Sequence, residues 1–254
     1  VIATTEEQIK ALRAGGKILS GVLGDVAKLC KEGVNTAELD LACEHAIRAR
    51  GAVPAFLNYH PDGAAYPYPA ALCISINDEV VHGIPSEKRI LRKGDIVSID
   101  TGLSYQGYFV DAARTLVVGG AGDTKTNQLI SATREALLAA ISVVRPGKHI
   151  GDIGAAVMRV AANHKFAIVQ DLGGHAVGGA VHEKPFIANE GREGTGDEIV
   201  VGYVLAIEPM LAEGKGAIIL DEDEWTYRMK DGKRAAHFED TVLVTETGAE
   251  ILTQ

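Results

Sequence analysis

Hydrophobic residues recur every three or four positions in four long segments, a spacing that places them on one face of an α-helix. Thr4 or Thr5 precedes the first segment as the expected N-cap, and Glu38 lies in position to complete a capping box at the start of the second. The pattern predicts helices over the ranges 9–23, 35–51, 126–144 and 150–163.

Runs of β-branched residues separated by glycine predict strands between and after these helices. The predicted strands cover the ranges 73–76, 95–100, 114–119, 166–170, 202–209, 216–220, 225–230 and 237–245. Two helix pairs, each followed by strands, indicate an α+β fold with an antiparallel-rich sheet.

One arrangement occurs twice along the chain. The segments 29–52 and 143–166 both read as a helix end, a glycine and a second helix, and Gly33 aligns with Gly147 at an offset of 114 residues. The repeat predicts two similar halves packed around a shared sheet, with a cleft between them where a site can form. Chance similarity between two amphipathic helix pairs is the alternative.

The chain of 254 residues has ordinary hydrophobic and charged fractions, so we expect one domain over 1–254. A net charge of -9 argues against direct DNA binding, which needs a basic face. Cys30, Cys43 and Cys73 form no CxxC pair, and no apolar run of the length of a membrane span is present. With no signal peptide at the start, we expect a cytoplasmic protein without membrane contact.

Two aspartates lie among apolar residues in consecutive strand-like segments. Asp100 ends the run DIVSID, and Asp111 follows a turn between Gly102 and Gly107. A hairpin would bring both carboxylates to the same end, where a metal ion would compensate their buried charge. The alternative is that each aspartate caps a turn.

Three further residues have the character of metal ligands. His175 lies in a glycine-rich run, Glu208 stands between Ile207 and Pro209, and Glu239 lies in a strand among apolar residues. Two aspartates, two glutamates and one histidine form an oxygen-rich set, which favours a pair of Mn, Fe, Co or Zn ions over one structural zinc.

The segment CISINDEVVHGIP at 73–85 resembles the signature of type I methionine aminopeptidases. The segments 98–100, 110–119, 173–185, 205–210 and 237–245 are similar to the metal-site segments of that family, in the same order. The resemblance covers nearly the whole chain. It implies the pita-bread fold, with two pseudo-symmetric halves, and removal of the initiator methionine from nascent polypeptides when the second residue is small.

The resemblance also implies a ligand set for two divalent metal ions. Asp100 would bind one ion and His175 the other, while Asp111 and Glu239 would bridge them. Glu208 would bind a metal ion and exchange protons with the hydroxide that bridges the two ions.

Two histidines and an apolar pocket complete the site that the resemblance implies. His182 would stabilise the oxyanion, and His82 would contact the peptide beyond the cleaved bond. The residues expected to hold the methionine side chain are Tyr59, Tyr68, Cys73, Trp225 and Phe56. The alternative for these aromatic residues is an ordinary place in the core, and for His82 a surface turn.

The chain departs from the family pattern in three places. The loop 60–67 is longer than usual, Val181 stands where many relatives carry an aromatic residue, and Ala176 replaces a common glycine. These changes bear on the shape of the pocket. We expect His237 to be an exposed strand histidine, with support of the metal site as the alternative.

Other readings within the same fold are a proline-specific aminopeptidase and a non-catalytic peptide-binding module. The segment 73–85 disfavours the first, and the presence of all five ligands disfavours the second. Only 25 residues separate His182 from Glu208, which is too few for the insertion of type II enzymes. We expect a monomer that acts on nascent N-termini, with transient ribosome contact as a possible addition.

Overall fold

The four predicted helices are all present in a computed structural model that describes residues 2–254. They are α1 (Glu6–Leu29), α2 (Thr36–Ala49), α3 (Thr124–Ser142) and α4 (Ile150–His164). Thr5 caps α1 in a reciprocal capping box with Gln8. At α2 the Asn35 side chain accepts the Glu38 N–H, which is one half of a capping box. The Glu38 carboxylate accepts from the Asn35 side-chain amide rather than from the Asn35 backbone N–H, so the predicted capping box is wrong.

Fifteen strands lie within the described residues, and several of them, among them those at 53–54 and 79–81, lie outside the predicted ranges. Several consist of two or three residues, too few for an alternation of polar and apolar positions to be visible. The strands are β1 (Val53–Pro54), β2 (Cys73–Ile76), β3 (Glu79–Val81), β4 (Ile96–Tyr105), β5 (Tyr108–Val117), β6 (Ala167–Ile168), β7 (Gly173–Ala176), β8 (Glu183–Ala188), β9 (Val204–Ile207), β10 (Met210–Ala212), β11 (Ile218–Leu220), β12 (Tyr227–Met229), β13 (Ala235–His237), β14 (Glu239–Val244) and β15 (Ala249–Ile251).

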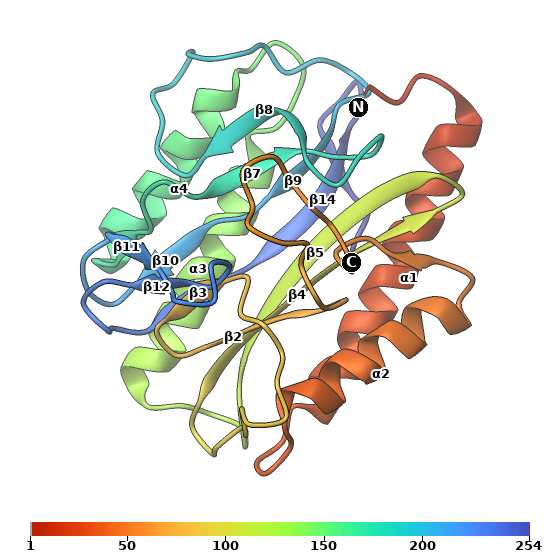
Figure 1. Cartoon of the computed structure of the whole chain (residues 1–254). Helices are drawn as coiled ribbons and strands as arrows, with labels where there is room; N and C mark the ends of the chain where they lie inside the picture. Colours follow the sequence, from red (N-terminus) through yellow and green to blue (C-terminus); the bar gives the residue numbers. More distant parts are fainter. Residues whose placement is uncertain (1) are drawn as a thin grey trace.

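Nine strands form one large antiparallel sheet, whose main path runs β1-β4-β5-β14-β9-β7-β8. Two smaller sheets, β13-β10-β6 and β11-β12-β3, lie beside it. Helices α1 and α2 pack against the half that contains β4 and β5, while α3 and α4 pack on the half that contains β9 and β8 (Figure 1). Each helix pair covers its own apolar core, so the two halves expected from the repeat are present.

The β4–β5 hairpin is longer than the sequence pattern predicted. Its turn lies at Gln106 and Gly107, whose φ angles of 52° and 84° are in the left-handed region. Gly102 does not form the turn but lies inside β4, opposite Asp111. A Cβ at Gly102 would meet Phe56 Cε1 at 2.9 Å. The absence of a side chain at Gly102 therefore makes room for a predicted pocket residue.

Two strands pass from the large sheet into a small one at the same point. Strand β9 continues into β10, and β13 continues into β14, with Ile207 opposite Asp240 on one side and Met210 opposite His237 on the other. Glu208 and Glu239 lie in this crossing. Among residues 2–254, no helix combines the length and the apolarity that a bilayer span requires.

Candidate active site

Strand register gathers three carboxylates on one face of the large sheet. Asp100 of β4 and Glu239 of β14 both stand opposite Ala113 of β5, which lies between them. Asp111 lies two residues before Ala113 and therefore points to the same face. The two aspartates are thus neighbours across a hairpin, as the sequence predicted, although they lie several residues from its turn.

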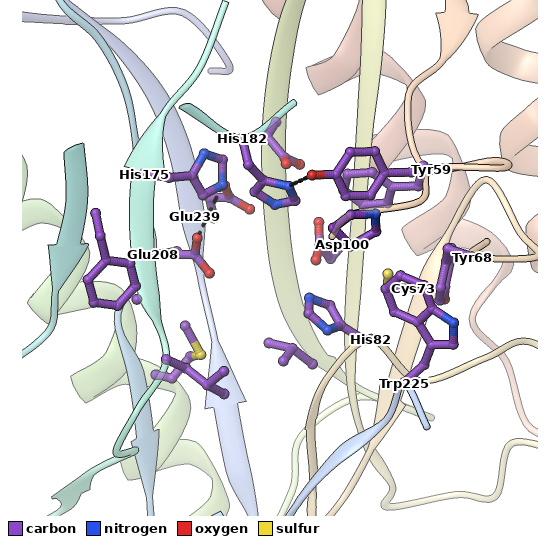
Figure 2. Close-up of a pocket in the computed structure, with 18 of the residues that line it drawn as sticks. Tyr59, Tyr68, Cys73, His82, Asp100, His175, His182, Glu208, Trp225 and Glu239 are labelled. Carbon is purple, nitrogen blue, oxygen red and sulfur yellow. Dashed lines mark hydrogen bonds and ion pairs between the residues drawn. The ribbon is translucent and has the colours of Figure 1, made fainter. Parts of the chain in front are cut away.

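The other half of the sheet supplies a histidine and a second glutamate. His175 of β7 stands opposite Ala206 of β9, which in turn pairs with Thr241 of β14. Glu208 follows β9 directly, and its Oε1 lies 3.5 Å from His175 Nε2. Figure 2 shows His175, Glu208 and Glu239 on one side of the pocket and Asp100 with the aromatic residues on the other.

The five predicted ligands form overlapping groups whose donor atoms lie within 4.8 Å of one another. One group contains Asp100, Asp111 and Glu239, and another contains His175, Glu208 and Glu239. A third joins Asp111 and His175 to His182. Glu239 and Asp111 each belong to two groups, so these two carboxylates connect the two ends of the site.

The carboxylates are held where their charges are costly. Burial, followed by the charges of Asp111 and Glu208, raises the pKa of Asp100 well above its usual value. Burial is also the main cause of a raised pKa at Glu208 and Glu239. It lowers the pKa of His175 to about 3, which keeps that imidazole neutral and able to act as a ligand. Four carboxylates this close ionise together only with cations between them.

The donor set fits divalent cations for a second reason. Asp100 Oδ1, Asp111 Oδ1 and Glu239 Oε1 are buried side-chain oxygens for which residues 2–254 provide no hydrogen-bond partner. Buried polar atoms are nearly always paired, so three such oxygens pointing at one point require an explanation. Carboxylate oxygens with one imidazole suit Mn, Fe, Co or Zn and provide no thiolate ligand.

The two predicted catalytic histidines flank this cluster. His182 is solvent-accessible, and its ring centroid lies 4.4 Å from that of His175. The Tyr59 hydroxyl lies 2.8 Å from His182 Nδ1. His82 follows β3 with φ at 61°, a left-handed conformation that a non-glycine residue rarely adopts outside functional sites. It stacks edge-on against Trp225.

A cavity of about 490 Å³ joins the metal ligands to the predicted pocket residues. Phe56, Tyr68, Cys73 and Trp225 are buried together in one apolar cluster, and Tyr59 packs at its edge. Burial raises the pKa of the Cys73 thiol well above its usual value, which leaves Cys73 an apolar wall residue. The sequence alone did not identify other lining residues, among them Val81, Leu172, Phe186 and Met210.

The long loop 60–67 closes one side of this cavity. Pro61 lines it directly, and the Tyr66 hydroxyl donates to the carbonyl of Asp223 at 2.5 Å. The Tyr66 ring also packs edge-on against Trp225. Val181 joins the apolar cluster. The loop therefore adds an aromatic contact to Trp225, which lines the cavity, from a place that the family pattern did not predict.

The expectation for His237 is wrong. Its side chain is 1% exposed, and its Nε2 lies 3.4 Å from Glu208 Oε2. Burial, together with the charges of His82 and Arg114, lowers the pKa of His237 to about 3. The sequence does not reveal that β13, which carries His237, pairs with β10 in a second sheet beside the large one.

Comparison with known proteins gives one consistent family. The profile of metallopeptidase family M24 matches residues 10–246. The methionine aminopeptidase of Aquifex aeolicus is 43% identical over 252 residues, which cover 98% of this chain and 97% of the relative. Methionine aminopeptidase 1 of Bacillus subtilis is 37% identical over 254 residues, with 100% and 99% coverage.

Solved structures agree with the sequence relatives. The crystal structure of a methionine aminopeptidase from Thermotoga maritima superposes with a TM-score of 0.94 at 38% identity, and covers 99% of this chain and 98% of that one. The prolidase of Pyrococcus furiosus has a TM-score of 0.76 at 24% identity, with 100% and 65% coverage. The similarity to the prolidase shows the fold alone. Two halves around a curled antiparallel sheet are the arrangement of the pita-bread fold.

Proposed function

The chain belongs to metallopeptidase family M24, and we propose that it is a methionine aminopeptidase. On this proposal it hydrolyses the first peptide bond of nascent polypeptides when methionine is followed by a small residue. The pita-bread fold and the identity to methionine aminopeptidases over nearly the full chain support this reading. The chain acts as a hydrolase with a metal-dependent site.

The observation that carries the mechanism is the overlap of the ligand groups. The group of Asp100 contains Asp111 and Glu239, and each of the two groups of His175 contains one of these carboxylates. This pattern supports two divalent cations: Asp100 would hold one and His175 the other, and Asp111 and Glu239 would contribute to both. When bound, the cations neutralise the buried carboxylates and supply Lewis acidity that yields a nucleophile from water near neutral pH.

Side chains around the ligands carry the remaining steps. Glu208, at the inner wall of the cavity, accepts a proton from the attacking water and returns it to the leaving amine. His182 would donate Nε2–H to the developing oxyanion in the tautomer in which Nδ1 accepts a hydrogen bond from the Tyr59 hydroxyl, 2.8 Å away. His82 contacts the peptide beyond the cleaved bond, from a position beside Trp225.

The apolar cluster supplies the preference for methionine. Phe56, Tyr68, Cys73 and Trp225, with Tyr59 beside them, line the same cavity as the ligands. An unbranched thioether side chain fills such a pocket well and makes favourable contacts with aromatic rings. A large second residue of the substrate would be crowded near Tyr59 and His182.

The ion identity, the assembly and the location in the cell extend the proposal. Oxygen and imidazole ligands accept Mn, Fe, Co or Zn. We propose a single catalytic unit over 1–254 that acts as a monomer, because both halves of one chain contribute ligands to the same cavity. Three buried free cysteines support a reducing cytoplasm, where contact with the ribosome would present the substrate.

The test is turnover of three peptides after chelation and re-addition of each metal. Met-Ala-Ser should be cleaved and Leu-Ala-Ser and Ala-Pro-Ala should not, with activity lost on chelation and restored by the ions. Cleavage only before proline would assign the chain to the proline-specific enzymes of this fold. Absence of turnover with every metal would favour a peptide-binding role.

A further inference from the structure

His237 lies against the metal-ligand cluster without any role in the mechanism above. Its side chain is 1% exposed, and neither ring nitrogen has a hydrogen-bond partner among the described residues. A buried imidazole left in this state is expensive, since it loses its hydrogen bonds to water and gains none in return. The ring is therefore expected to bind and orient a neighbouring polar group.

Glu208 is the group that the ring faces. Its Oε2 lies 3.4 Å from His237 Nε2, and its Oε1 lies 3.5 Å from His175 Nε2. The carboxylate thus stands between two imidazoles. One belongs to a ligand group, whereas His237 belongs to none of the three. This difference argues for a supporting position rather than direct metal binding by His237.

The fold fixes His237 in this place from both sides. Residue Met210 pairs with His237 where β10 and β13 leave the large sheet, so Glu208 and the histidine meet at the crossing of the two chains. Thr115 of β5 holds the backbone, because its hydroxyl accepts the His237 N–H at 3.0 Å and donates to the His237 carbonyl at 2.5 Å. The ring can therefore hold its neighbour in one orientation.

We propose that His237 is a positioning residue for Glu208: with a cation bound beside His175, its Nε2–H would close on Oε2 from the present 3.4 Å and direct Oε1 toward that cation. The inference rests on the proposed function, which makes Glu208 a metal ligand and proton carrier. Partners that hydrogen-bond a ligating carboxylate orient it, and their removal typically costs about 10–100-fold in metal affinity. Without this hydrogen bond, the Glu208 carboxylate would sample other rotamers, and Oε1 would no longer be held toward the cation position.

The experiment measures Mn²⁺ binding to metal-free protein by isothermal titration calorimetry, together with kcat and KM at saturating metal. His237→Leu removes the donor at similar volume, and His237→Gln retains an N–H donor of similar reach. We expect the leucine variant to bind Mn²⁺ about 10–100-fold more weakly. We expect the glutamine variant to retain most of the wild-type affinity. At saturating metal, the leucine variant should lose kcat while KM stays near its wild-type value.

The control is His164→Leu, which removes an exposed histidine paired with Glu135 at the end of α4. It should bind Mn²⁺ as the wild type does. If His237→Leu does not fold, His237→Ala removes the same donor without a clash and takes its place. Equal Mn²⁺ affinity in the leucine variant and the wild type would overturn the proposal. Equal weakening by leucine and glutamine would do so too, because shape rather than the donor would then matter. Failure of the wild type to bind Mn²⁺ would instead remove the proposed function itself.

Discussion

Removal of the Tyr59 hydroxyl tests whether the fold sets the protonation of His182. Tyr59→Phe leaves the ring at the edge of the pocket and deletes only the group that lies 2.8 Å from His182 Nδ1. That hydroxyl has no other hydrogen-bond partner given by residues 2–254. Without it, nothing on Nδ1 favours the tautomer whose Nε2–H points at the oxyanion.

The expected size of the effect follows from one hydrogen bond at a half-exposed position. Its net contribution is about 1 kcal/mol, which corresponds to a change of about fivefold in rate. The loss should appear in kcat rather than KM, because the oxyanion exists only in the transition state. By comparison, complete loss of an oxyanion donor costs about 100–1,000-fold, so His182→Ala should be much the more damaging change.

The assay is Met-Ala-Ser turnover with restored metal, for wild type, both single variants and the double variant. Once His182 is absent, Tyr59→Phe should have no further effect, so the double variant should match His182→Ala. Tyr203→Phe, a tyrosine packed on the other half of the molecule, is the matched control and should leave kcat unchanged. A fivefold loss that persists in the His182→Ala background would refute the tautomer argument, since the hydroxyl would then act elsewhere.

Three further changes test the ligands, the pocket and the core. Glu239→Gln keeps the shape of a carboxylate that belongs to two ligand groups but removes its charge. Bound metal per chain, measured by mass spectrometry, should therefore fall together with activity, and full metal content would contradict the connecting position of Glu239. Gly102→Ala places a methyl group 2.9 Å from Phe56 Cε1 and should raise KM for Met-Ala-Ser, and an unchanged KM would mean that Phe56 does not shape the pocket. Leu19→Ala leaves a cavity at a fully buried position on the inner face of α1 and should lower the free energy of unfolding, measured by urea titration, by about 2–5 kcal/mol. A smaller loss would mean that neighbouring side chains collapse into the cavity.

Much of the fold was predictable from local pattern. The periodic apolar positions and the cap at Thr5 located four helices, because a helix buries one stripe of side chains and must satisfy its first N–H groups. The strands β4, β5 and β14 were also found, since their runs are long. The strands β3, β7 and β8, of three to six residues, were not, because their segments show no clear run of β-branched residues.

The sequence by itself determined which residue types the site contains. Asp100, Asp111 and Glu239 stand in apolar strands, where an unpaired carboxylate is costly and a metal ion is the simplest compensation. Their meeting on one face was only implied, because register across β4, β5 and β14 depends on contacts far apart in the chain. The motif resemblance supplied what spacing could not.

Only the tertiary structure decided the partners of these residues. The Tyr59–His182 hydrogen bond joins residues 123 positions apart, and His237 is buried because two sheets meet where Glu208 lies. Burial and distance are properties of the packed chain, so an alternating pattern reads the same in an exposed strand and in one covered by a second sheet. The pattern therefore fixes the composition of the site, and packing fixes its geometry and the state of its protons.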